Sequence, residues 1–95
     1  MRRRAKVDAN QPAIVLALRQ AGAIVQHLHT AGAGVPDLLV GYRGINYLME
    51  VKDENAPRAD QVLTVAQVKF HDEWRGQVAI VKNATDALRV IGAVK

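Results

Sequence analysis

Three short apolar runs, separated by glycine-containing turns, dominate the first half of the chain and strongly restrict its fold. The runs cover residues 23–28, 35–40 and 46–52. Each has the length of a strand, and the segments between them, 32–34 and 41–44, carry the glycines that tight turns favour. The pattern predicts three consecutive strands that pair as a meander.

Helical patterns flank this meander. Helices are expected over about residues 8–21, 64–74 and 85–91. Pro12 is tolerated only in the first turn of the first of these helices, and Gly22 is its stop signal. The expected N-terminal caps are Asp8, Thr64 and Thr85.

A fourth strand is expected at residues 77–81. It is almost entirely apolar, which predicts burial on both faces. A helical crossover joins it to the meander, so the sheet should be mixed, with helices packed against it. The fold class is therefore an α/β (α+β mixed-sheet) domain of order α-β-β-β-α-β-α. We expect one small domain, residues 8–95, after a basic N-terminal arm of residues 1–7, with a polar loop at 53–63.

The positive charge of the chain is concentrated in this arm. The net charge is +4, from 13 Lys/Arg and 9 Asp/Glu, and the remainder of the chain is neutral once the cations of the arm are set aside. Those cations are Arg2, Arg3, Arg4 and Lys6. Such an arm suits contact with a nucleic-acid backbone, which is electrostatic and independent of sequence. The alternative is a solvated terminus without a partner.

Composition excludes several other classes of protein. Cysteine is absent, which excludes disulfides, thiolate metal sites and cysteine nucleophiles. No apolar run is long enough to span a membrane, and no apolar segment follows the basic start as in a secretory signal, so a cytoplasmic location is expected. Because aromatic residues are few, the core should be small and aliphatic, and a partner subunit or bound ion would help to stabilise it.

Charged residues interrupt two of the predicted strands. Asp37 lies in the second, and Glu50 and Lys52 share one face of the third because side chains alternate along a strand. A turn centred between Arg43 and Gly44 would place Asp37 directly opposite Glu50. The two carboxylates should therefore meet.

Neighbouring carboxylates on a partly buried sheet repel each other, and a divalent cation removes that repulsion. Oxygen ligands without nearby His or Cys favour Mg²⁺ or Mn²⁺, which can activate water and polarise a phosphate. Lys52 could orient that water or stabilise charge on the phosphorus centre. The alternative is that Asp37 is a turn residue and that Glu50 and Lys52 form an ordinary salt bridge on a solvated face.

The segments 34–40 (GVPDLLV) and 48–52 (LMEVK) resemble the signature of the PD-(D/E)xK nuclease superfamily, in particular its minimal VRR-NUC branch, which is related to Holliday-junction resolvases. The resemblance extends over nearly the whole chain. It implies a restriction-endonuclease-like core and Mg²⁺- or Mn²⁺-dependent hydrolysis of DNA. It further implies that Asp37 and Glu50 bind the metal, aided by the backbone carbonyl of Val51, and that Lys52 is catalytic.

Two glutamines have two interpretations each. The family often has a Gln near the active site in the helix of Gln67, but Thr64-x-x-Gln67 is also a capping box. Relatives often carry a Glu ligand in the first helix, where this chain has no acidic residue between positions 10 and 21. Gln11 is the nearest substitute, and with Asp8 it too resembles a capping box.

The aromatic and histidine side chains carry no comparable pattern. Trp74 follows Phe70 by one helical turn and is expected in the core. The histidines show no convincing ligand spacing and are expected as surface or core residues. They are His27, His29 and His71.

The sequence thus predicts a metal-dependent endonuclease acting on DNA, with branched or junction DNA as the candidate substrate that the resemblance implies. A homodimer is expected, because junction cutting needs two sites. The minimal size is typical of a phage or bacterial protein. The main alternative is a nuclease-like module that binds nucleic acid or protein without cutting, and a structural subunit without metal affinity is the weaker one.

Overall fold

A four-stranded mixed sheet organises the structure, a computed structural model that describes residues 7–28 and 30–94. The elements are α1 (Gln11–Gln20), β1 (Ile24–His27), β2 (Leu38–Tyr42), β3 (Ile45–Val51), the short 3-10 helix η1 (Arg58–Gln61), α2 (Val65–Glu73), β4 (Val78–Val81) and α3 (Ala84–Val90). The strands lie in the order β1-β2-β3-β4, with β4 parallel to β3 and the other pairs antiparallel. The predicted order of helices and strands is confirmed, and η1 lies within the predicted loop.

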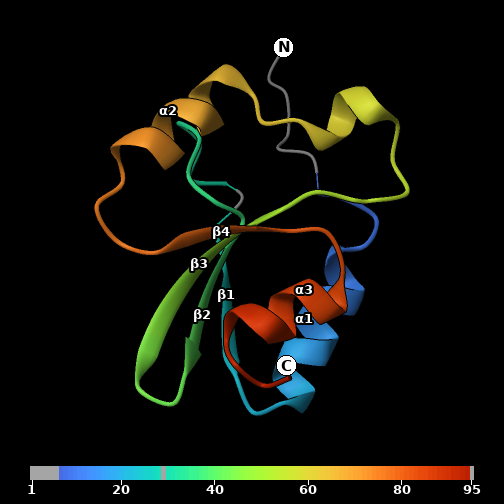
Figure 1. The fold of residues 1–95 in the computed structure, drawn as a ribbon, viewed down its shortest axis with the longest axis vertical. Helices are drawn as coiled ribbons and strands as arrows, with labels where there is room; N and C mark the ends of the chain where they lie inside the picture. Colours follow the sequence, from blue (N-terminus) through green and yellow to red (C-terminus); the bar gives the residue numbers. More distant parts are fainter. Residues whose placement is uncertain (1–6, 29, 95) are drawn as a thin grey trace.

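The core lies between the sheet and the pair α1 and α3, which pack against each other (Figure 1). Its buried side chains carry no aromatic ring, as the composition led us to expect. They are Ile14, Val15, Leu18, Ala23, Val25, Leu38, Val40, Met49, Val51, Val81, Ala87 and Ile91.

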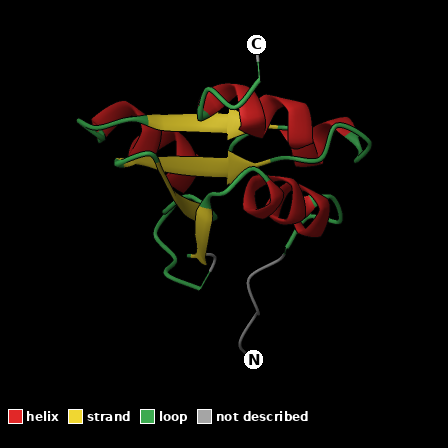
Figure 2. Ribbon diagram, turned by 90° about the horizontal axis from the view of Figure 1, so that it is seen from below, coloured by secondary structure: helices red, strands yellow, loops and turns green. Residues whose placement is uncertain are grey.

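Helix α2 lies apart from this core. Figure 2 shows α1 and α3 together toward one end of the molecule and α2 toward the other. No residue of α2 is fully buried, so the helix does not depend on a large apolar interface for its position. The face of the sheet that points away from α1 and α3 is consequently only partly covered.

Two predictions about apolar residues are wrong for this reason. Strand β4 is an edge strand, and Ile80 on its outer face is 42% exposed rather than buried. Trp74 is 45% exposed and stacks on Phe70, with ring centroids 5.0 Å apart, outside the core. Burial on both faces would require a helix over β4 that α2 does not provide.

The N-terminal caps of two helices also differ from the prediction. Asn10, not Asp8, occupies the cap position of α1, and its amide donates to the carbonyls of Lys52 (3.2 Å) and Lys82 (2.9 Å). These bonds tie the start of α1 to the ends of β3 and β4. Helix α3 is capped by Asn83, whose side chain accepts from Asp86 N–H at 2.8 Å, because the backbone at Asn83 is extended and the helix already begins at residue 84.

Two further predictions from the sequence concern the basic N-terminal arm and the absence of a membrane-spanning segment. The basic residues 2–4 and 6 lie outside the described residues, so the predicted arm is not placed. Among the described residues, none of the helices has the length and apolar character needed to cross a membrane.

Candidate active site

A tight hairpin brings Asp37 and Glu50 together. The two-residue turn 43–44 joins β2 to β3, and both of its residues have positive φ, 52° and 81°, as such turns require. The pairing ends with Leu38 opposite Met49. One step further, the same register places Asp37 opposite Glu50, as predicted from the sequence.

Asp37 lies immediately before β2, which corrects the predicted strand start at residue 35. The turn 32–34 has positive φ at each of its residues, and Pro36 has no N–H to donate to a strand partner, so regular pairing begins only at Leu38. The carboxylate of Asp37 accepts a hydrogen bond from the N–H of Val51 at 2.7 Å. The carboxylate thereby replaces the backbone carbonyl that would accept from Val51 if β2 and β3 continued to pair.

Glu50 lies on the face of β3 that points away from α1 and α3, and Lys52 follows directly after the end of this strand, which corrects the predicted strand end at residue 52. They are 2% and 7% exposed, and Lys52 Nζ lies 3.9 Å from Glu50 Oε2. The alternative of a solvated surface salt bridge is therefore wrong. Two charged side chains at this depth are costly unless they are paired with other polar groups.

Gln67 of α2 supplies that pairing. Its Oε1 accepts from Lys52 Nζ and from the N–H of Thr64, each at 2.9 Å, and its Nε2 donates to Glu50 Oε2 at 3.0 Å. Thr64 Oγ1 accepts in return from the N–H of Gln67 at 3.2 Å, which completes the capping box. The capping-box interpretation of Gln67 is therefore confirmed, and the same side chain also contacts Glu50 and Lys52.

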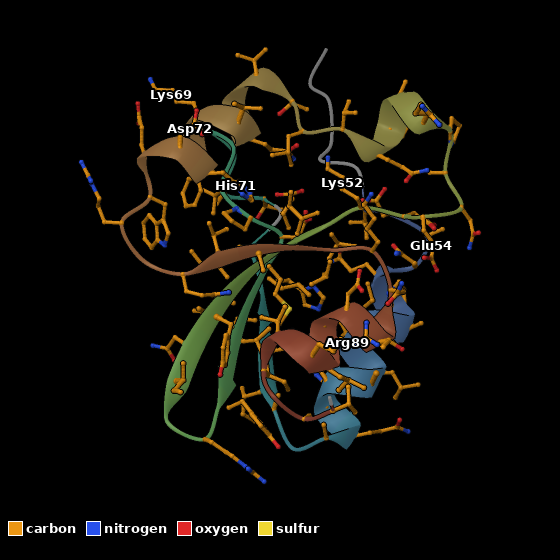
Figure 3. The ribbon with its side chains drawn as sticks, viewed as in Figure 1. Lys52, Glu54, Lys69, His71, Asp72 and Arg89 are labelled. Atoms are coloured by element: carbon orange, nitrogen blue, oxygen red, sulfur yellow. The ribbon has the colours of Figure 1, made fainter. Side chains whose placement is uncertain are left out.

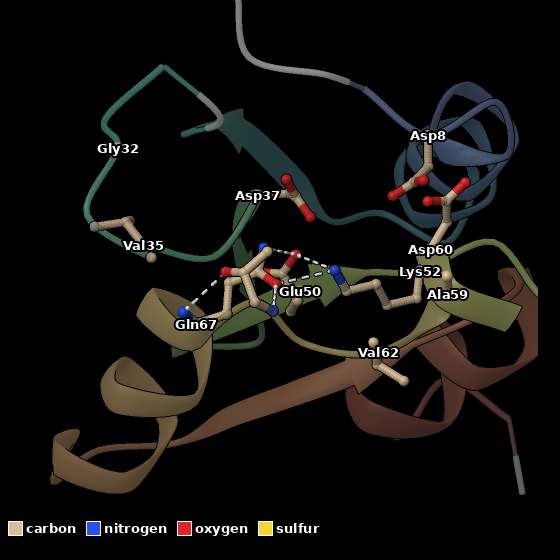
Figure 4. Close-up of a pocket in the computed structure, with 12 residues that line it drawn as sticks. Asp8, Gly32, Val35, Asp37, Glu50, Lys52, Ala59, Asp60, Val62 and Gln67 are labelled. Atoms are coloured by element: carbon tan, nitrogen blue, oxygen red, sulfur yellow. Dashed lines mark hydrogen bonds and ion pairs between the residues drawn. The ribbon is translucent and has the colours of Figure 1, made fainter.

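These side chains line a cavity of about 350 Å³ (Figure 4). The turn 32–35 forms one side of it, and the loop around η1 forms the other. Asp8 and Asp60 also line this cavity (Figure 4). Sequence reasoning missed both carboxylates: Asp8 was interpreted as a helix cap, and Asp60 lies in a loop without a recognisable motif.

Glu50 has the most perturbed pKa of the site. Burial is the main cause that raises the pKa of Glu50 to about 9, and the charge of Asp37 and its hydrogen bond with Glu50 raise it further. The charge of Lys52 lowers this pKa, and the charge of Asp8 raises it. Its Oε1 is buried and has no hydrogen-bond partner among the described residues. A neighbouring cation would both lower this pKa and satisfy the oxygen.

The donor set fits Mg²⁺ or Mn²⁺. The described residues contain no group of three or more His, Cys, Asp or Glu side chains placed to hold a metal, so an ion here would have to keep waters or use a backbone oxygen. The N–H of Val51 points toward Asp37, and in a strand the N–H and C=O of one residue point to the same side. The Val51 carbonyl is therefore directed toward the side of the carboxylates.

The structure does not bring Gln11 into this site. Gln11 is absent from the lining of the cavity, and its Nε2 lies 3.3 Å from His27 Nδ1 in a second cavity beside α1. Its predicted capping box with Asp8 is wrong, because Gln11 Oε1, which would accept from the N–H of Asp8, has no hydrogen-bond partner among the described residues.

The histidines do not assemble into a ligand set among the described residues. His71 lies on the side of α2 that faces the sheet, whereas Lys69 and Asp72 lie on its outer side (Figure 3). Burial lowers the pKa of His71, and its Nε2 has no hydrogen-bond partner among the described residues. His29 lies outside the described residues.

Comparison with solved structures finds a match over most of the chain. A chain described as a VRR_NUC domain aligns with a TM-score of 0.63 and 28% sequence identity, over 85% of this chain and 88% of that one. No protein-family model matches the sequence, and the search of curated proteins found no match. The resemblance inferred from the sequence motifs is confirmed at the level of the VRR-NUC branch, and so is the restriction-endonuclease-like fold.

Proposed function

We propose that this chain, with its VRR-NUC-type nuclease fold, is a Mg²⁺- or Mn²⁺-dependent endonuclease that hydrolyses phosphodiester bonds in DNA. The observation that carries the proposal is the buried Glu50, whose Oε1 has no partner among the described residues and which lies beside Asp37. A buried carboxylate beside a second, half-buried one destabilises a domain of this size unless a cation balances their charge. A metal-dependent activity accounts for retaining such a pair.

The proposed roles follow from the geometry. Asp37 and Glu50, with the carbonyl of Val51, would hold the cation. When bound there, Mg²⁺ would polarise the phosphoryl group and lower the pKa of a coordinated water. The ammonium of Lys52, held 2.9 Å from Gln67 Oε1 at the cavity, stabilises negative charge that develops on the phosphate or orients the attacking water.

The proposal extends to branched or junction DNA and to a homodimer. A junction presents two strands for cutting that are related by approximate two-fold symmetry, and a symmetric dimer presents two cavities in the same relationship. The basic residues Arg2, Arg3, Arg4 and Lys6 would contact the DNA backbone. Sedimentation equilibrium at several protein concentrations measures the oligomeric state, and a monomer at all concentrations contradicts the dimer.

A nuclease-fold module that binds without cutting is the second candidate. The observation that favours it is the small set of side-chain ligands: among the described residues, no three His, Cys, Asp or Glu side chains are placed together to hold a metal ion. Such a module predicts binding of DNA or protein without metal-dependent cleavage.

A cleavage panel separates the two candidates. Branched, duplex and single-stranded DNA are incubated with wild-type protein and Mg²⁺ or Mn²⁺. Cleavage is expected for wild type and for Asp72→Asn, a control on the outer side of α2, and is expected to disappear in Asp37→Asn and Glu50→Gln. If no substrate is cut with either ion, the enzyme proposal is wrong, and calorimetry with Mn²⁺ then shows whether the site still binds metal.

A further inference from the structure

The side-chain amide of Gln67 is held by three groups at once. Two donors, the N–H of Thr64 and Nζ of Lys52, approach Oε1 at 2.9 Å, and the acceptor Glu50 Oε2 lies 3.0 Å from Nε2. An amide can rotate by half a turn and exchange its oxygen for its NH₂ group. In the rotated state, the NH₂ group would face two donors, so the hydrogen bonds from Thr64 and Lys52 would both be lost.

The three groups differ in how rigidly they are placed. Lys52 carries its ammonium on a flexible four-carbon stem, which can follow a displaced partner. The N–H of Thr64 belongs to the backbone at the start of α2, and it points at Gln67 because the capping box closes the first turn. The backbone N–H is therefore the fixed reference for the orientation of the amide.

The first turn of α2 is itself located by a close backbone contact. A side chain at Gly34 would collide with the backbone of Ala66 and Gln67, so the loop that leads to Asp37 lies directly against this turn. Because α2 has no fully buried residue, its position over the sheet depends on such contacts. The capping box thus sits between the Asp37 loop and the Lys52 side chain.

We propose that Thr64 is a positioning residue for the reaction: its main-chain N–H holds the Gln67 amide with Oε1 toward Lys52 and Nε2 toward Glu50. This inference rests on the proposed nuclease function. Thr64 contributes no group to the reacting atoms. It acts through Gln67, and through Gln67 it determines where the Lys52 ammonium is held.

Two substitutions at Thr64 separate its N–H from its hydroxyl. Thr64→Val removes the hydroxyl and keeps the N–H. Thr64→Pro removes both, and the φ of −70° at Thr64 matches that of proline. We expect Thr64→Val to lower kcat about twofold and Thr64→Pro to lower it roughly tenfold further, the size of effect that one lost hydrogen bond can produce, with KM for DNA unchanged. Equal kcat values for the two variants would overturn the inference.

A double-mutant cycle distinguishes positioning from damage to the helix. In a Gln67→Ala background, the difference between Thr64→Pro and Thr64→Val should disappear, because the N–H then has no amide to hold. A difference that persists undiminished in this background means that the N–H acts on the fold of α2 and not through Gln67. If Thr64→Pro does not fold, an ester in place of the amide between residues 63 and 64 removes the N–H alone.

Side-chain amide NMR of the metal-free protein gives a readout that does not require activity. The Gln67 NH₂ signals are assigned by their loss in Gln67→Ala. They should be well separated in wild type and in Thr64→Val, and should move toward free-amide values in Thr64→Pro. Unchanged signals in Thr64→Pro contradict the inference. If wild type cuts no substrate, the nuclease proposal fails, and this measurement still decides whether Thr64 orients Gln67.

Discussion

The carboxylate of Asp37 accepts a 2.7 Å hydrogen bond from the main-chain N–H of Val51. This bond fixes Asp37 at the end of β3. There, the charge of Asp37 and its separate hydrogen bond with Glu50 raise the pKa of Glu50. Asp37 therefore has two separable contributions: it completes the backbone hydrogen bonding of the sheet, and it supplies negative charge to the cavity.

Substitution by Asn or Ala should separate these contributions. Asp37→Asn keeps an oxygen for the Val51 N–H and removes the charge, so we expect lost cleavage with metal-free stability equal to or above that of wild type. Asp37→Ala leaves the N–H without its partner and should lower the free energy of unfolding by about 1–3 kcal/mol relative to Asp37→Asn. Urea denaturation in the presence of a chelator measures the difference. Equal stability of the two variants would show that the hydrogen bond contributes little.

The stability of the metal-free protein should fall as the pH rises. The pKa of Glu50 is raised from its ordinary value of 4.5 to about 9, chiefly by burial. Between these two values, the folded state binds more protons than the unfolded state, so each increase in pH favours unfolding. We expect Tm to decrease between about pH 5 and pH 9 in the presence of a chelator. Glu50→Gln removes the titrating group and should flatten this dependence; an equally steep decrease in that variant would assign it to other groups.

Metal binding should release protons from the same site. Near neutral pH, Glu50 with its pKa of about 9 is protonated, whereas a ligand carboxylate must be ionised. Binding of Mg²⁺ or Mn²⁺ at pH 7 should therefore release about one proton per ion. Calorimetric titration in two buffers of different ionisation enthalpy measures this number. Binding without dependence on the buffer would place the ion away from Glu50.

Local rules predicted the part of the site that depends on strand pairing. The turn 43–44 determines which residues of β2 and β3 face each other, and alternation determines that Glu50 and Lys52 share a face. Both follow from residues close together in sequence, and both were correct. The second strand begins at Leu38 and not at residue 35 as predicted, because Pro36 interrupts the pairing.

The remainder of the site depends on how distant elements pack, and no local pattern encodes that. Gln67 reaches Lys52 because the first turn of α2 lies over the end of β3. Gln11 is directed toward His27 because the Asn10 amide anchors α1 to two strand ends. For the same reason, Asp8 lines the cavity although the sequence suggested only a helix cap.

Two neighbouring glycines offer a matched test of how α2 is placed against the Asp37 loop. Gly32 and Gly34 have similar positive φ, 74° and 77°, so an alanine at either position introduces comparable backbone strain, about 1 kcal/mol. They differ in their surroundings: a side chain at Gly32 meets open space, whereas one at Gly34 collides with the backbone of Ala66. Backbone cannot move aside as a flexible side chain can, so Gly34→Ala must displace α2 or the loop.

We therefore expect Gly34→Ala to lower cleavage by at least about tenfold more than Gly32→Ala, because displacement of Gln67 by even a fraction of an ångström weakens its bonds to Lys52 and Glu50. Steady-state cleavage and urea denaturation of both variants provide the comparison. The Gln67 amide signals should also shift in Gly34→Ala and stay in place in Gly32→Ala. Similar losses in the two variants would mean that backbone strain in the turn, and not the contact with α2, determines the activity.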